Sequence, residues 1–315
     1  MKLNQLIAQF VAFRKSLGAK FEGNETVLHT FSRVVGEGRH VGNVSPREVA
    51  AFLKGRGPVT RHWHRKYIVL RGFFRYAVSR GYLSASPLPT TVPKLPERFK
   101  PYIYSREELR RLLDHTATAQ TRRFQVEAHT FRTLLLLLYG AGLRVSEALS
   151  LNLEDVDLQE AVLVIRDTKF FKTRLVPLGS ELNGVMKAYT KQRKKGGPSQ
   201  SGDAPFFVTR LGARVPVYLI QRGFRRLRAQ AGVRREDGAR YQPRLHDLRY
   251  AAAVHRLTAW YREGKNVQRL LPLLSTYLGH VDLVSTQIYL TVTPELMHKA
   301  SKRFAKYVFA EGGHD

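Results

Sequence analysis

The sequence contains no cysteine, so this chain can form neither disulfide bonds nor zinc sites with thiolate ligands. Acidic residues are scarce, because 25 Asp and Glu stand against 53 Lys and Arg. No apolar run is long enough to span a bilayer, and the amino terminus lacks the apolar centre of a signal peptide. We therefore expect a soluble protein that is not exported and has no membrane partner.

The excess of basic residues gives the chain a formal net charge of +28. These residues are spread over the whole length rather than collected in one tail, which favours folded basic surfaces over a disordered basic arm. A polyanion is the expected partner of such a protein, and a nucleic acid is the natural candidate.

The first domain is predicted to be helical and to cover residues 1–86. Its clearest helix covers 60–80, where Trp63, Tyr67, Leu70, Phe74 and Ala77 share one face at helical spacing. We expect the opposite face to lie along DNA phosphates. The residues predicted there are Arg61, His64, Arg65, Arg71 and Arg75.

A proline-rich stretch, 87–103, cannot continue a helix, because each proline removes a backbone donor and restricts the residue before it. We interpret it as an extended, semi-rigid linker between two domains. The second domain is then 104–315.

The second domain is predicted to be mainly helical with a small sheet. Ser105 and Glu108 have the spacing of a capping box, which predicts a helix start, and 131–141 reads as a buried helix. The segments 161–165 and 174–178 are typical of strands, and 204–209 is a candidate third strand.

The last quarter of the chain carries the residues that point to chemistry. His246 and Arg249 are three apart, so on a helix both can reach one anion. The run Leu278-Gly279-His280 is followed nine residues later by Tyr289, whose hydroxyl can act as a nucleophile. Neither Tyr277 nor Tyr307 has this offset from the histidine.

With Arg144 in the run Gly140-Ala141-Gly142-Leu143-Arg144, and Lys169 25 residues further on, these motifs resemble those of the tyrosine recombinases, the phage-integrase and Xer-like family. The resemblance covers roughly 105–304 strongly, and the first domain only in helical character and charge. It implies a SAM-like core-binding domain that grips DNA, and a catalytic domain with a three-stranded antiparallel sheet. Together they would form a C-shaped clamp around the duplex.

Each residue type suits attack on a phosphodiester. Planar guanidinium groups can hold the negative charge that gathers on the non-bridging oxygens, which is the role expected of Arg144 and Arg249. An ordinary tyrosine has a pKa near 10, so Tyr289 needs help to ionise. His246 is placed to accept its proton or to hold the phosphate.

The resemblance implies further roles and a product. It assigns the general acid to Lys169, with Lys172 as competing candidate, and implies that His280 donates to a phosphate oxygen. Glu147 is expected to support the arginines, and Lys172 and Arg174 to contact DNA. The implied product is a 3′-phosphotyrosine with a free 5′ hydroxyl, formed with no metal, cofactor or ATP.

Two departures from the family pattern stand out. Tyr250 occupies a position where a histidine is common, and 260–274 is longer than the usual connection. A type IB topoisomerase and a catalytically silent DNA-binding protein are the alternatives. A two-metal nuclease is disfavoured, because no convincing acidic triad is present.

We expect double-stranded DNA at specific sites as the partner, and a homo-oligomer that is a dimer on one site and a tetramer in the synapse, possibly with related recombinases. The resemblance places the protein on bacterial DNA in the cytoplasm, borne on a mobile element and acting in integration, excision or transposition.

Overall fold

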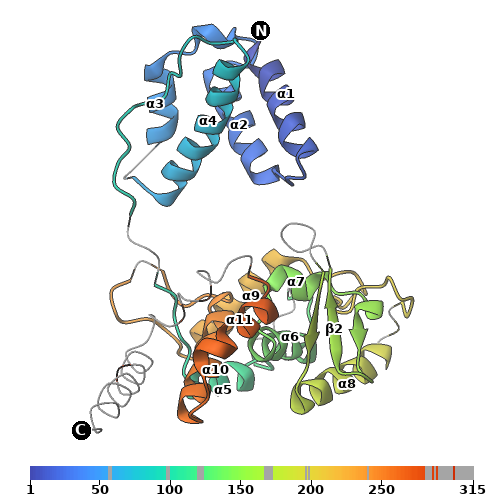
Figure 1. Cartoon of the computed structure of the whole chain (residues 1–315). Coiled ribbons are helices and arrows are strands. Elements are labelled where there is room, and N and C mark those ends of the chain that lie inside the picture. The colour runs from blue at the N-terminus through green and yellow to red at the C-terminus, as the bar shows by residue number, and fades with distance from the viewer. Residues whose placement is uncertain are drawn as a thin grey trace, which may run out of the picture. The chain divides into compact units, whose positions relative to one another are not determined.

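The computed structural model describes residues 1–55, 59–96, 100–118, 124–166, 173–195, 197, 199–239, 241–280, 286, 289 and 301. This part of the chain is mainly helical with one small antiparallel sheet, as predicted (Figure 1). It divides into two compact units, Met1–Phe99 and Lys100–Asp315. The division falls inside the stretch predicted as the linker. No described helix is both long and apolar enough to cross a membrane.

The first unit is a cluster of helices around an aromatic core. Its α-helices are α1 (Leu3–Ser16), α2 (Glu22–Val35), α3 (Pro46–Lys54) and α4 (Arg61–Ser79). Phe10, Phe31, Phe73 and Phe74 lie in the core, and Phe31 contacts Phe74 edge-on at 5.9 Å between ring centroids. The predicted helix over 60–80 is confirmed as α4, and the Thr60 hydroxyl accepts from a first-turn amide at its start.

The first part of the predicted linker packs back onto this unit. Leu88 packs against the core, the Tyr67 hydroxyl donates to the Pro89 carbonyl at 3.5 Å, and Arg61 donates to the Pro96 carbonyl at 3.2 Å. Because this proline-rich stretch forms no regular secondary structure, its carbonyls are available to side chains of α4.

The second unit is built around one buried helix. Its helices are α5 (Arg106–Asp114), α6 (Ala128–Gly140), α7 (Val145–Ser150), α8 (Ser180–Lys195), α9 (Val217–Gln230), α10 (Asp247–Arg262) and α11 (Val267–Leu278). Helix α6 is apolar on most sides, as expected of a central helix, and it contacts α7, α8 and α10. The predicted capping box is confirmed at α5, where Ser105 and Glu108 exchange hydrogen bonds of 2.8 and 3.1 Å.

The sheet has the order β1 (Val156–Asp157), β2 (Val162–Ile165) and β3 (Arg174–Pro177), all antiparallel. Leu163 pairs with Val176, and both are buried. The first two predicted strands are confirmed.

The prediction of a strand over 204–209 was wrong. The third strand is β1, whereas 204–209 makes only isolated bridges, Asn152 with Pro205 and Val208 with Arg214. The segment is apolar because Phe206 and Phe207 are buried in the core, and the Phe206 carbonyl accepts from Tyr189 and Arg193 of α8. Its hydrophobic pattern therefore reflects burial, not a ladder.

Candidate active site

The site begins at a tight turn between α6 and α7. Gly142 has φ +61°, and a Cβ atom there would lie 2.8 Å from Leu278 Cδ2, so a side chain would be excluded by both backbone and packing. Arg144 follows as the residue before α7. Glu147 accepts hydrogen bonds from the Arg144 backbone amide at 3.0 Å and from its guanidinium at 2.6 Å.

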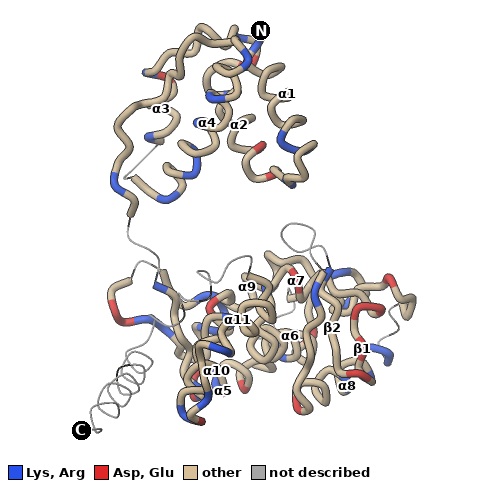
Figure 2. The backbone as a smooth tube through the Cα atoms, viewed as in Figure 1, with Lys and Arg blue, Asp and Glu red and all other residues tan. Residues whose placement is uncertain are grey.

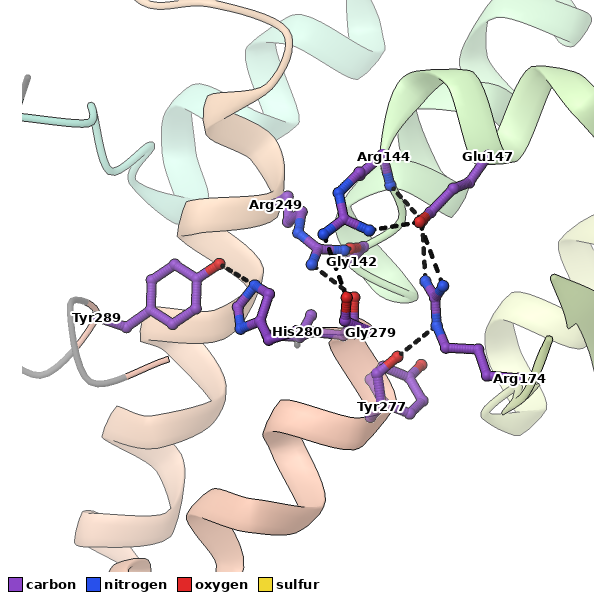
Figure 3. Close-up of polar contacts among 10 residues, drawn as sticks. Gly142, Arg144, Glu147, Arg174, Arg249, Tyr277, Gly279, His280 and Tyr289 are labelled. Atoms are coloured by element: carbon purple, nitrogen blue, oxygen red, sulfur yellow. Dashed lines mark hydrogen bonds and ion pairs between the residues drawn. The ribbon is translucent and has the colours of Figure 1, made fainter. Parts of the chain in front are cut away.

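Three arginines converge on the carboxyl end of α11 (Figure 3). Arg174 donates to the Tyr277 carbonyl at 3.1 Å, Arg249 to that of Leu278 at 2.6 Å, and Arg144 to that of Gly279 at 3.2 Å. The last carbonyls of a helix have no partner within the helix and carry partial negative charge. The arginines therefore fasten this helix end while remaining close to one another.

The buried arginine of this group is Arg249, which is 2% exposed. It also donates to the Gly142 carbonyl at 2.5 Å, so it joins the α6–α7 turn to α11. Arg144 is different, because its side chain is 33% exposed and can reach a ligand from outside.

Arg174, which is predicted to contact DNA, binds groups within the protein, and its contact with DNA stays a prediction. Its side chain is only 10% exposed, and its guanidinium binds both carboxylate oxygens of Glu147, at 2.9 and 3.2 Å. Burial acts to raise the pKa of Glu147, but hydrogen bonds from Arg174 and Arg144 hold that pKa at about 2. Glu147 thus links the two arginines, in agreement with the supporting role predicted for it.

The strand period offered a clue to Arg174 that the sequence interpretation missed. Arg174 and Val176 are two apart on β3 and face the same, inward side, whereas Leu175 is 64% exposed. Gly279 is part of the same arrangement. It has φ +68°, and a Cβ atom there would lie 2.7 Å from the Arg174 guanidinium.

The structure brings His280 and Tyr289 together. The Tyr289 hydroxyl lies 3.3 Å from His280 Nε2, and His280 Nδ1 lies 2.7 Å from the Thr286 hydroxyl. Tyr289 is 3% exposed. Burial raises the pKa of its phenol, while the positive charge of Arg249 acts in the opposite direction. The phenol is therefore protonated at neutral pH and needs a base.

His246 lies at the exposed rim of the site, immediately before α10. Partial desolvation, with the positive charges of Arg249 and Arg244, lowers the pKa of His246 to about 4, so the ring is neutral at neutral pH. Tyr250 packs edge-on against His246 at 5.6 Å and against Tyr289 at 5.2 Å between ring centroids. The tyrosine that departs from the family pattern thus supports both side chains, a contact that sequence spacing did not reveal.

Lys169 and Lys172, the candidate general acids, lie outside the described residues. Their assignment stays a prediction. Within the described ranges, no group of three or more His, Asp or Glu side chains could hold a metal ion.

The basic face predicted on the first unit needs one correction. Arg61, Arg65, Arg71 and Arg75 are exposed along α4, where basic positions recur (Figure 2). His64 is only 8% exposed and packs against the Trp63 ring, so it does not belong to that face. Its helical spacing matches that of Arg71 and Arg75, seven and eleven residues further on, so tertiary packing and not the helix period determines that it is covered.

Comparison with known proteins adds independent observations. The phage integrase family matches residues 104–295. A protein named integrase/recombinase y4rB from Sinorhizobium fredii is 35% identical over 305 residues, which cover 96% of each chain. Tyrosine recombinase XerA of Thermococcus kodakarensis is 32% identical over 253 residues, 80% of this chain and 78% of the relative.

Solved structures share the fold. The Tn1549 transposon integrase in complex with circular intermediate DNA has a TM-score of 0.69 at 18% identity, covering 96% of this chain and 99% of that one. The XerH recombinase bound to its difH substrate has a TM-score of 0.62 at 19% identity, covering 89% and 77%. The predicted resemblance is confirmed, and since a relative aligns over nearly the whole length, the chain belongs to the phage integrase family of tyrosine recombinases.

Proposed function

We propose that this chain is a site-specific DNA recombinase that cleaves and rejoins strands through a 3′-phosphotyrosine formed at Tyr289. The observation that carries the proposal is the convergence of the Tyr289 hydroxyl, the His280 imidazole and the guanidinium groups of Arg144 and Arg249 around one helix end. Together these residues supply a nucleophile, a proton acceptor and the cationic donors that a phosphodiester needs as it becomes pentacoordinate.

Arg144 and Arg249 bind the non-bridging oxygens in this proposal. Because backbone carbonyls and Glu147 already orient their guanidinium planes, little reorganisation is needed when the phosphate arrives. Arg174 is not a catalytic residue in this scheme. It positions Arg144 through Glu147.

The Tyr289 oxygen attacks phosphorus, and its proton passes to the imidazole that it contacts, His280 Nε2 at 3.3 Å. His246, neutral and at the rim, donates a hydrogen bond to the phosphate. The bond from phosphorus to the 5′ oxygen breaks, and Lys169 gives that oxygen a proton, with Lys172 as the competing donor. The products are a 3′-phosphotyrosine and a free 5′ hydroxyl.

Since the ester is conserved in the intermediate, attack by a hydroxyl from another strand reverses the step without ATP or metal. We assign strand exchange in a tetramer to this chain, with two copies on each site. We further propose that 1–86 grips the duplex, that 87–103 connects it to the catalytic domain 104–315, and that the two close as a C-shaped clamp. The names of the relatives support integration, excision or transposition of a mobile element as the role.

Covalent trapping tests the proposal. Duplex fragments tiled across the DNA that flanks the gene, each nicked near its centre, are incubated with the protein in chelator and then denatured. We expect a protein–DNA adduct that is lost in Tyr289→Phe. Tyr277→Phe is the matched control, because the Tyr277 hydroxyl donates to the Pro177 carbonyl and lies off the reacting set.

Three other results would change this proposal. An adduct that survives in Tyr289→Phe would overturn the assignment of the nucleophile. Tight binding without any adduct would identify a silent DNA-binding protein. An adduct with supercoil relaxation but no exchange between two sites on a plasmid would identify a topoisomerase.

A further inference from the structure

The basic stripe on the exposed face of α4 has uncharged residues at its centre. Arg61, Arg65, Ile68, Gly72 and Arg75 follow one another at steps of four, three, four and three residues, so they form one stripe along the helix. All five are exposed. The middle of this basic stripe is therefore occupied by an isoleucine and a glycine.

Ile68 is not part of the core of the first unit. It is 58% exposed, whereas the next residues, Val69 and Leu70, are buried. A single exposed apolar side chain is common on protein surfaces and by itself indicates nothing. Its place between cationic side chains, one turn from an exposed glycine, is the informative observation.

Nothing in the described structure requires glycine at position 72. Its φ is not positive, and an added Cβ atom would meet only Phe10 Cζ, at 3.7 Å, which is an ordinary contact. Glycine inside a helix is less stable than alanine. A missing side chain on an exposed helix face leaves room for the backbone to come close to another molecule.

The surrounding charges indicate which molecule this is. Arg71 and Arg75 make no ion pair or hydrogen bond with another described residue, so their guanidinium groups are available to an anionic partner, whereas that of Arg65 lies against Gly23 of α2. The major groove of duplex DNA admits an α-helix between two rows of phosphates, and thymine presents its C5-methyl group there to apolar side chains.

We propose that Ile68 and Gly72 read base edges in the major groove, while the flanking arginines hold the phosphates. Gly72 lets the helix backbone approach the bases, and Ile68 packs against a thymine methyl. This inference rests on the proposed function, because it specifies how that DNA site is recognised.

Uracil substitution tests Ile68. The full-length Tyr289→Phe chain is titrated against the fragment that gave the covalent adduct, or against the fragment bound most tightly if none did. Thymines are replaced one at a time by uracil, which lacks only the methyl. We expect one replacement to weaken binding about three- to fivefold, the effect of exposing one methyl group, and to have no effect on Ile68→Ala.

Val34→Ala is the matched control, because Val34 is 65% exposed on α2 of the same unit, away from this stripe. It should keep the full response to uracil. If the response also persists in Ile68→Ala, or if no thymine responds in the parent chain, the methyl contact is wrong.

Gly72→Ala tests the close approach. We expect an unchanged or higher melting temperature but about tenfold weaker binding to the same fragment. Gly184→Ala is the matched control, since Gly184 lies in α8 with open space around its Cα, and should leave binding unchanged. Equal binding by Gly72→Ala and the parent chain would overturn the close approach. If Tyr289 still forms its adduct in that case, the proposed function stands and only this inference fails.

Discussion

The arginines of the two units are held in opposite ways. In the second unit, Arg144, Arg174 and Arg249 are bound to carbonyls and to Glu147 before any substrate arrives. On α4 of the first unit, Arg71 and Arg75 are exposed and bind no other described residue. In the second unit the contacts fix the orientation of the guanidinium groups. In the first unit the guanidinium groups are left available to a partner.

This difference separates catalysis from affinity. Ordering the catalytic guanidinium groups takes place during folding, so their effect should appear in the rate of cleavage. In the proposed function the α4 arginines meet phosphates and release counterions, so their effect should appear in binding and in its dependence on salt. Substitutions in the two units should therefore change different measured quantities.

The largest effect is expected for Arg249→Ala. Removing one preorganised donor to a developing oxyanion costs roughly 3–4 kcal/mol, or two to three decades in rate. The substitution also leaves the Gly142 and Leu278 carbonyls without their donor, so the melting temperature should fall. Single-turnover cleavage at saturating DNA measures the first effect and thermal unfolding the second. A cleavage rate within fivefold of the parent would contradict the role.

Arg174→Gln should reduce cleavage about 10- to 100-fold, because Glu147 loses its bidentate partner and no longer fixes Arg144. DNA affinity should change less than twofold, since Arg174 is largely buried. Arg174→Lys should restore part of the rate by supplying a cation to Glu147. A large loss of affinity with an unchanged cleavage rate would instead return Arg174 to the DNA-contact surface.

The double substitution of Arg71 and Arg75 by glutamine should give the reverse result. Affinity should fall by about tenfold at physiological salt, and the slope of log affinity against log salt should become shallower by about 0.9 for each lost phosphate contact. Cleavage at saturating DNA should stay within twofold of the parent. An unchanged slope would mean that these arginines do not meet DNA.

The smallest effect concerns His246 in the protein without DNA. Its pKa of about 4 lies below the ordinary value near 6.5, so the unfolded chain takes up the proton first as pH falls. The stability contributed by the neutral ring is present above pH 6.5 and is lost between about 6.5 and 4. Because the ring is exposed and solvent screens its charge, only part of this shift should appear in the stability, and the drop in melting temperature from pH 7.5 to 4.5 should be smaller in His246→Gln by about 1–3 °C. An equal drop in both proteins would contradict the shifted pKa.

Local sequence patterns predicted most of the helices and strands and pointed to the residues of the candidate site. The capping box at Ser105 and the buried period of α6 required only neighbouring residues, and both were confirmed. The spacing of His280 and Tyr289 singled out this tyrosine, and the structure adds that the two side chains lie in contact. These features depend on contacts close in sequence.

The features that local patterns did not predict involve partners that lie far apart in the chain. Arg174 binds Glu147, 27 residues away, and the Tyr277 carbonyl, 103 residues away. The alternation of side chains along β3 can show that Arg174 faces inward, but it cannot show that its partner is Glu147. His64 and 204–209 failed for a related reason, because burial in three dimensions decided their environment.

The end of α11 has a consequence for inheritance. Three successive carbonyls, those of Tyr277, Leu278 and Gly279, each accept from a different arginine, which come from β3, α10 and the α6–α7 turn in that order. Gly279 lies against the Arg174 guanidinium with no space for a side chain. A substitution at any one of these positions disturbs the fastening of the others. These positions should therefore be conserved together among related proteins, whereas the residues of the α4 stripe, which have no such shared contacts, should be able to change one at a time.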